Sequence, residues 1–127
     1  MMTMRRIAQV LKENVREKYD QVGRYGGDEF VVLLNNTDIT TANKKAECLA
    51  EKINSLQMEH RYSPISSYET VTIGLAAMIP EDDTALEELF KRADSALYLG
   101  KEQGKNQVQV WNDSIPDKSH LPLSSWA

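Results

Sequence analysis

The chain has little cysteine and little histidine: among 127 residues there is one thiol, Cys48, and there are two imidazoles, His60 and His120. A single cysteine cannot close an internal disulfide, which agrees with a reducing compartment. Neither histidine has a cysteine or an acid at ligand spacing, so the sequence argues against a zinc site. Nucleophilic catalysis is not indicated either, because no partner pattern accompanies the paired serines Ser66, Ser67, Ser124 and Ser125.

Long apolar runs and an excess of cations are also missing. No stretch of about 18 apolar residues is present, and the N-terminus lacks the apolar segment of a signal peptide, so we expect no membrane insertion and a cytoplasmic location. The chain carries 15 Lys and Arg against 19 Asp and Glu, a formal net charge of −4. Nucleic acid is therefore not an expected partner, since phosphate-backbone binding needs clustered cations. A nucleotide held at one local site is compatible with this charge.

What the chain does have is a turn of two glycines and two acids, Gly26-Gly27-Asp28-Glu29, followed by the apolar run 30–34. Adjacent glycines can take positive φ angles, so the chain can reverse sharply and leave its N–H groups open to a ligand. The apolar run is typical of a strand buried on both faces. An ordinary hairpin with solvated acids has the same composition, because turns favour these residues anyway.

The spacing of apolar residues predicts a helix, a hairpin and a second helix in the first half of the chain. The opening helix is amphipathic, with the apolar face Met4, Ile7, Ala8, Leu11 and Val15. Residues 22–34 form the hairpin, and Asp38 or Thr40 starts the next helix. That helix has the apolar face Ala42, Ala46, Leu49, Ile53 and Leu56.

In the second half, residues 71–77 predict a central strand with Gly74 at a close approach of two backbones. Residues 84–87 fit a capping box, so a helix begins there, and Gly104 ends it as a left-handed cap. The buried stripe expected of this helix is Leu86, Leu89, Phe90, Ala93 and Leu97. Residues 108–111 alternate as a final strand.

The length of 127 residues indicates a single domain. The order helix, hairpin, helix, strand, helix, strand predicts a mixed α/β (α+β) fold, in which helices cover one face of a largely antiparallel sheet. We place the domain at residues 1–111. Residues 112–127 contain prolines and serines and little periodicity, so we expect a loosely packed C-terminal tail.

Two pairs of charged residues are candidates for chemistry. Asp28 and Glu29 offer oxygens to a hard cation such as Mg²⁺, which typically takes one or two carboxylates plus phosphates and water. Such a metal would offset the charge of nucleotide phosphates. Lys101 lies at the end of the last helix and Lys105 just past Gly104. Residues four apart on a helix share one face, so both lysines can meet one triphosphate if the helix end folds toward the turn. The helix dipole also favours cations at this end without any ligand.

Three separated segments resemble the GGDEF family, the diguanylate cyclase domains. They are Arg24-Tyr25-Gly26-Gly27-Asp28-Glu29-Phe30, Val71-Thr72-Ile73-Gly74 and the helix end at residues 92–106. The resemblance covers the chain from Met4 to about Val110. It implies a nucleotide-cyclase-like, ferredoxin-related fold. It also implies a head-to-head dimer that condenses two GTP molecules to cyclic di-GMP with Mg²⁺ or Mn²⁺.

The resemblance also implies roles for six residues. The substrate-binding residues are Gly26, Gly27, Lys101 and Lys105, and the catalytic residues are Asp28 and Glu29, of which Asp28 is the metal ligand. The family more often has arginine where this chain has Lys105. Lysine keeps the charge there but loses the bidentate fork of arginine.

The chain departs from the family at two places. Where the family has an Arg-x-x-Asp product-inhibition site, this chain has Glu17-Lys18-Tyr19-Asp20, and Arg16 is one residue out of register. We therefore expect no feedback binding of cyclic di-GMP. The family's first strand, which bears a metal-binding Asp, and the following segment, which reads guanine, have no counterpart here.

These departures lead to two expectations. With fewer metal carboxylates and no guanine-reading residues, we expect an N-terminally truncated domain that is inactive or very weak as a cyclase. A sheet without its central first strand should expose an edge and apolar surface, so we expect a homodimer or higher self-association. The alternative function is a degenerate GGDEF module that binds GTP or dimerises in signalling.

Overall fold

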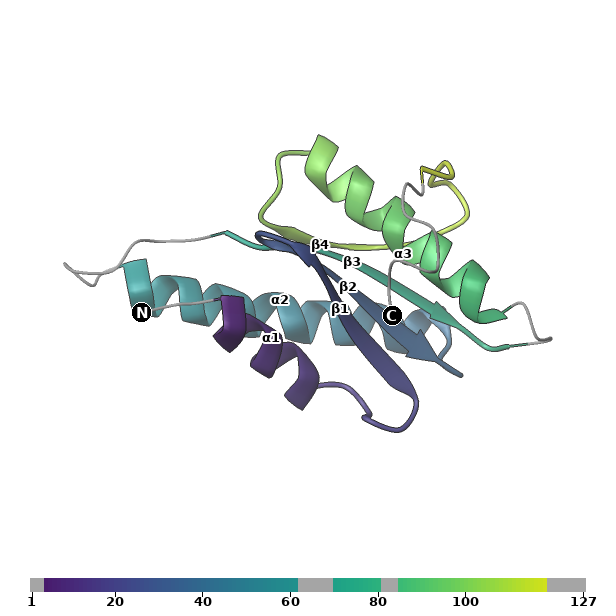
Figure 1. Ribbon diagram of the computed structural model, residues 1–127, viewed down its shortest axis with the longest axis horizontal. Coiled ribbons are helices and arrows are strands. Elements are labelled where there is room, and N and C mark those ends of the chain that lie inside the picture. Colours follow the sequence, from purple (N-terminus) through teal and green to yellow (C-terminus); the bar gives the residue numbers. More distant parts are fainter. Residues whose placement is uncertain (1–3, 62–69, 81–84, 119–127) are drawn as a thin grey trace.

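The computed structural model describes residues 4–61, 70–80 and 85–118 (Figure 1). In these ranges the elements follow the predicted order. They are α1 (Met4–Glu13), β1 (Asp20–Gly26), β2 (Glu29–Asn35), α2 (Ile39–Arg61), β3 (Thr72–Met78), α3 (Ala85–Glu102) and β4 (Gln107–Val110). None of the described helices combines the length and the apolar character needed to cross a membrane.

The described strands form one mixed sheet in the order β1-β2-β3-β4. β1 and β2 pair antiparallel as the predicted hairpin, whereas β2 with β3 and β3 with β4 pair parallel. The expectation of a largely antiparallel sheet is therefore wrong. A helix connects β2 to β3 and another connects β3 to β4, and such crossovers let each strand run in the same direction as the one before.

Helices cover both faces of the sheet, and not one face as expected (Figure 1). α1 and α2 pack on the face that presents Phe30, Val32 and Leu34. α3 packs on the opposite face, against Val31 and Leu33. Successive side chains of a strand point to opposite faces, so the unbroken apolar run of β2 needs cover on both sides.

β2 is paired along both of its edges, so the described sheet has no gap at its centre. Its register with β3 runs through seven positions, from Glu29 opposite Thr72 to Asn35 opposite Met78. The central exposed edge that we expected from a missing strand is therefore not present in the described sheet. The edges of that sheet are β1 and β4.

The two helices on the first face follow the predicted patterns closely. Ile7 and Leu11 of α1 are fully buried. α1 ends at Glu13, so Val15 packs on the core from the following loop, and Val10, which the pattern omitted, is also buried.

Asp38 caps α2, because its Oδ1 accepts a hydrogen bond of 2.8 Å from the backbone N–H of Thr41. The predicted apolar face of α2 is confirmed. Leu56 is half-buried, and the buried members are Ala42, Ala46, Leu49 and Ile53.

α3 lies directly on β3 because Gly74 has no side chain. A Cβ atom at Gly74 would collide with the carbonyl oxygen of Ala93 and lie 2.5 Å from the backbone nitrogen of Leu97. The predicted close approach is thereby confirmed. Leu86 is 49% exposed, contrary to the predicted stripe, because it lies in the first turn of α3, ahead of the segment that packs on the sheet. The rest of the stripe is buried: Leu89, Phe90, Ala93 and Leu97.

The described residues after β4 return over α3. The N–H of Trp111 donates to the carbonyl oxygen of Leu75 at 2.8 Å, and the N–H of Lys118 donates to Ser95 Oγ at 2.9 Å. Ile115 is 8% exposed. This part of the predicted tail therefore contacts the domain. Residues 119–127, and the first residue of the predicted capping box at 84–87, lie outside the described residues.

Candidate functional site

The glycine-acid turn joins β1 to β2. Gly26 and Gly27 have φ angles of +148° and +53°, and the pairing register shifts between Arg24 and Gly26, as in a β-bulge. A Cβ atom at either glycine would meet no atom within 4 Å. The glycines are therefore required by the backbone conformation and not by crowding, and the space around the turn is open.

Arg24 and Phe30 of the same motif brace this turn. Arg24 donates from Nε and from a terminal nitrogen to the carbonyl oxygen of Gly27, at 3.1 and 2.8 Å. Its guanidinium lies 5.9 Å from the centre of the Phe30 ring, and that ring is fully buried. These two residues hold the turn in place, a role that the sequence analysis missed although both stand in the recognised motif.

Asp28 is tied to the sheet through its backbone. Its carbonyl oxygen accepts a hydrogen bond of 3.0 Å from the N–H of Thr72. The hydroxyl of Thr72 accepts from the N–H of Asn106 at 3.1 Å, and Asn106 Oδ1 accepts from Gln57 Nε2 at 2.8 Å. This series of contacts connects the turn to β3, to the segment after α3 and to α2.

Sequence reasoning did not find the roles of Thr72, Asn106 and Gln57. Thr72 and Asn106 appeared only as members of segments that resemble the family. Gln57 gave no signal, because one polar residue in a long helix is ordinary. In the structure its side chain is buried, with an exposure of 3%, and it donates to Asn106.

The end of α3 folds toward the turn and brings one of the two predicted lysines to it. Lys101 Nζ lies 2.7 Å from Glu29 Oε1, and the two side chains are 41% and 25% exposed. Lys105 is exposed, and its own φ angle is +63°. It lies beyond α3, which ends at Glu102, so the two lysines do not share a helix face as predicted. The N–H of Lys105 donates to the carbonyl oxygen of Gly100 at 2.9 Å. The structure thus places Lys101 beside the acids, and phosphate binding by either lysine stays a prediction.

The acids of the turn do not complete a metal site with the described residues. In the described ranges, no three His, Cys, Asp or Glu side chains come together closely enough to hold an ion. Glu29 is also paired with Lys101. A Mg²⁺ ion needs near-octahedral oxygen coordination, so these donors alone do not fit a complete Mg²⁺ or Mn²⁺ site. Asp28 stays a predicted ligand.

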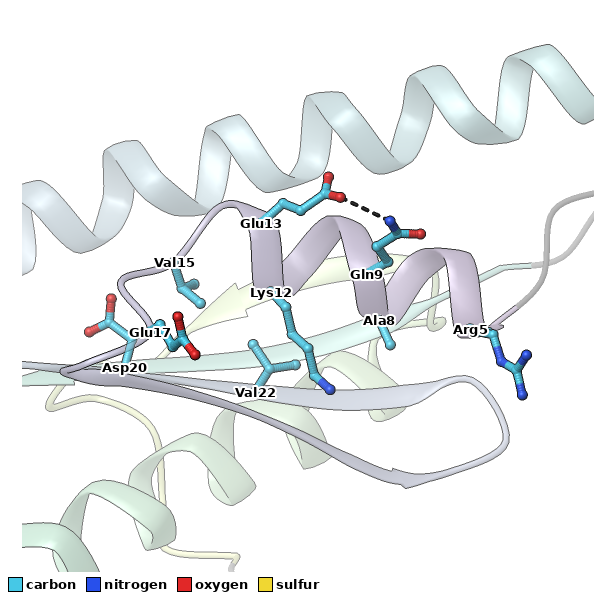
Figure 2. A pocket seen from close by; sticks show the side chains of 9 residues that line it. All are labelled: Arg5, Ala8, Gln9, Lys12, Glu13, Val15, Glu17, Asp20 and Val22. Carbon is cyan, nitrogen blue, oxygen red and sulfur yellow. Dashed lines mark hydrogen bonds between the residues drawn. The ribbon is translucent and has the colours of Figure 1, made fainter.

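A cavity of about 760 Å³ lies between α1 and β1 (Figure 2). Figure 2 shows Arg5 at one end of the cavity and Glu17 and Asp20 at the other, with Lys12 and Val22 between them. None of the predicted site residues lines this cavity. It is therefore separate from the turn.

Comparison with known proteins gives one family. Residues 2–107 match the family model described as diguanylate cyclase, GGDEF domain. Diguanylate cyclase A of Treponema denticola is 31% identical over 110 residues, which are 87% of this chain and 29% of that protein. Diguanylate cyclase DosC of Escherichia coli K12 is 30% identical over 112 residues, 88% of this chain and 24% of that protein.

Signaling protein YkoW of Bacillus subtilis is 35% identical over 104 residues, which are 81% of this chain and 13% of that protein. The chain therefore spans less than a third of the length of these curated relatives. No solved structure matches the chain significantly.

Proposed function

Because this chain belongs to the GGDEF family of diguanylate cyclase domains, we propose that it serves in cyclic di-GMP signalling as a module that binds GTP. In this proposal Gly26 and Gly27 approach the phosphates, and Lys101 and Lys105 hold phosphate oxygens. The observation that carries the proposal is the contact between Lys101 and Glu29, which brings a cation to an open glycine turn. Backbone N–H groups at such turns and nearby lysines are common means of binding phosphate.

We also propose that the 127-residue chain makes little or no cyclic di-GMP by itself. Asp28 and Glu29 are the catalytic candidates, with Asp28 as the metal ligand. The carboxylate of Glu29 already forms an ion pair with Lys101. A divalent cation normally offsets phosphate charge during phosphoryl transfer. Weak binding of Mg²⁺ or Mn²⁺ by an incomplete donor set therefore predicts slow chemistry.

Incubation with GTP and Mn²⁺, followed by chromatography for cyclic di-GMP, tests turnover. We expect no more product from the unchanged chain than from Asp28→Ala. Product that disappears in Asp28→Ala would overturn the proposal of low activity and would establish a working cyclase.

Calorimetry with GTP tests binding separately. We expect a saturable heat that is lost in Lys101→Ala and kept in Lys91→Ala. Lys91 is the matched control because it is a half-exposed lysine of the same helix that pairs with Glu87, with 3.8 Å between Nζ and Oε1. If the unchanged chain gives no heat with GTP, the nucleotide-binding proposal is wrong.

The second candidate function is a dimerisation module located in the cytoplasm. The supporting observation is that β1 is an edge strand of the described sheet and borders the cavity against α1. Unpaired backbone groups of an edge strand can pair with another chain. Analytical ultracentrifugation at micromolar concentration tests this candidate, and a stable monomer would contradict it.

A further inference from the structure

Glu29 and Lys101 are both predicted site residues, and in the structure they form an ion pair with each other. Glu29 begins β2 immediately after the glycine turn, and Lys101 lies in the last turn of α3. Their charged atoms are 2.7 Å apart, so the ammonium and the carboxylate neutralise each other where the proposed phosphates must arrive. A triphosphate that approaches this turn therefore meets a paired lysine.

We propose that Glu29 competes with phosphate for Lys101, so that the ion pair restrains the binding of triphosphates at the turn. This inference rests on the proposed function, because it concerns the same site. The side chain of Lys101 is 41% exposed, and a lysine has a flexible four-carbon stem with three donors. Its ammonium can therefore turn from the carboxylate to a phosphate oxygen without movement of α3.

Glu29 and the triphosphate compete for Lys101, and their charges decide which of the two the ammonium of Lys101 prefers. Glu29 offers a single negative charge in a partly exposed pair, and such pairs are weak because water screens them. A triphosphate carries several negative charges and attracts the ammonium more strongly, but it must also approach the Glu29 carboxylate, which repels it. Removal of the carboxylate should therefore release Lys101 and strengthen binding.

Calorimetry with inorganic triphosphate, without a divalent cation, tests the competition. The variants are Glu29→Gln, Lys101→Gln and the double variant, and the double-mutant cycle isolates the coupling between the two residues. Glu17→Gln is the matched control, since it makes the same charge change at an exposed position next to the α1–β1 cavity. Circular dichroism confirms that each variant is folded.

We expect Glu29→Gln to bind triphosphate about tenfold more tightly than the unchanged chain, and Glu17→Gln to change the affinity little. In the Lys101→Gln background, most of the gain from Glu29→Gln should disappear. An equal gain in both backgrounds would overturn the proposal, because Glu29 would then act by repulsion alone and not through Lys101.

The remaining outcomes separate this inference from the proposed function. If the unchanged chain binds GTP and triphosphate and Glu29→Gln binds them no more tightly, the competition is wrong and nucleotide binding stands. If Glu29→Gln binds triphosphate in a Lys101-dependent way while the unchanged chain binds nothing, the competition stands and the proposed function fails. If no variant binds either ligand, both proposals are wrong.

Discussion

Asp20 accepts three hydrogen bonds from Arg16: one of 2.7 Å from the backbone N–H, and two from the guanidinium at 3.1 and 2.9 Å. The same guanidinium donates to the carbonyl oxygen of Asn35 at 2.6 Å and to Thr37 Oγ1 at 2.8 Å. The hydrogen bonds to Asp20 raise the pKa of Arg16. The pair therefore fastens the start of β1 to the end of β2.

Replacement of Asp20 by Asn should lower the free energy of unfolding by about 2 kcal/mol. The side chain of Asp20 is 2% exposed, whereas that of Arg16 is 50% exposed. Water can solvate the released guanidinium, so the cost should stay below the roughly 3–5 kcal/mol typical of a broken, fully buried pair. Urea unfolding followed by circular dichroism measures this loss. Glu17→Gln is the control and should change stability by less than about 0.5 kcal/mol.

Gly74→Ala should be among the most damaging single changes, because the added methyl group must displace the backbone of α3 at Ala93 and Leu97. We expect a loss of at least about 3 kcal/mol, at the upper end of the cost of overpacking. Thermal unfolding of the purified variant measures this loss.

Gly100→Ala is the control for Gly74→Ala. Its Cβ would lie 3.0 Å from a methyl group of Thr72 and 3.3 Å from Cγ of Gln109, so it would meet side chains and not the backbone of another element. Alanine also favours the helix by about 1 kcal/mol over glycine. Equal losses in the two variants would contradict the inference that the contact of α3 with β3 depends specifically on Gly74.

Asp38 should make stability depend on pH through the cap of α2. The hydrogen bond from the backbone N–H of Thr41 lowers the pKa of Asp38 in the folded protein. A lowered folded-state pKa stabilises the fold above the unfolded-state pKa, and this contribution is lost as pH falls through the folded-state value.

We therefore expect Asp38→Ala to lower the urea midpoint at neutral pH, and the difference from the unchanged chain to shrink under acid conditions. Asp38→Asn is the matched variant, because asparagine also caps helices but does not titrate in this range. A constant difference between Asp38→Ala and the unchanged chain across the acid range would show that the charge of Asp38 does not stabilise the cap.

Arg92 should contribute to stability through its ring contact with Trp111. Its guanidinium lies 4.1 Å from the centre of the indole, and its Nε donates to Glu88 Oε1 at 3.1 Å. Arg92→Lys keeps the charge but loses the flat guanidinium, so it should cost about 0.5–1 kcal/mol.

Urea unfolding compares Arg92→Lys with Lys91→Arg, its neighbour in the same helix. Lys91 pairs with Glu87 at 3.8 Å while both side chains are about half-exposed, so its replacement should be nearly neutral. If the two variants are equally stable, the contact with Trp111 contributes nothing measurable.

Local patterns in the sequence predicted the parts of the fold that depend on neighbouring residues. The cap at Asp38 and the close approach at Gly74 follow from the chemistry of one residue and its immediate surroundings. Strand direction depends on which strands meet, and this was predicted wrongly. The unbroken apolar run of β2 already favoured a parallel strand with cover on both faces, but only the burial was inferred from it.

The candidate site shows the same division. The glycine turn could be predicted, because it has special residues. The approach of Lys101 to the turn was stated only as a condition, because it depends on where the end of the last helix lies in the fold. The hydrogen bond between Gln57 and Asn106 and the pairing of Arg16 with Asp20 could not be predicted. Gln57 and Asn106 are far apart in the sequence, so no local pattern connects them. Asp20 was considered only as part of the altered product-inhibition site, and therefore not as the partner of Arg16.

The seven-position ladder between β2 and β3 limits how a strand from another molecule can enter this sheet. Insertion between them would break every pair of that ladder, whereas β1 and β4 each have one unpaired side in the described sheet. A peptide supplied in trans should therefore lengthen the sheet at its margin. Beside β1, such a peptide would be separated from Glu29 by a whole strand. A carboxylate carried by such a peptide would therefore meet the turn from its β1 side, next to Gly26, and not from the β3 side of Glu29.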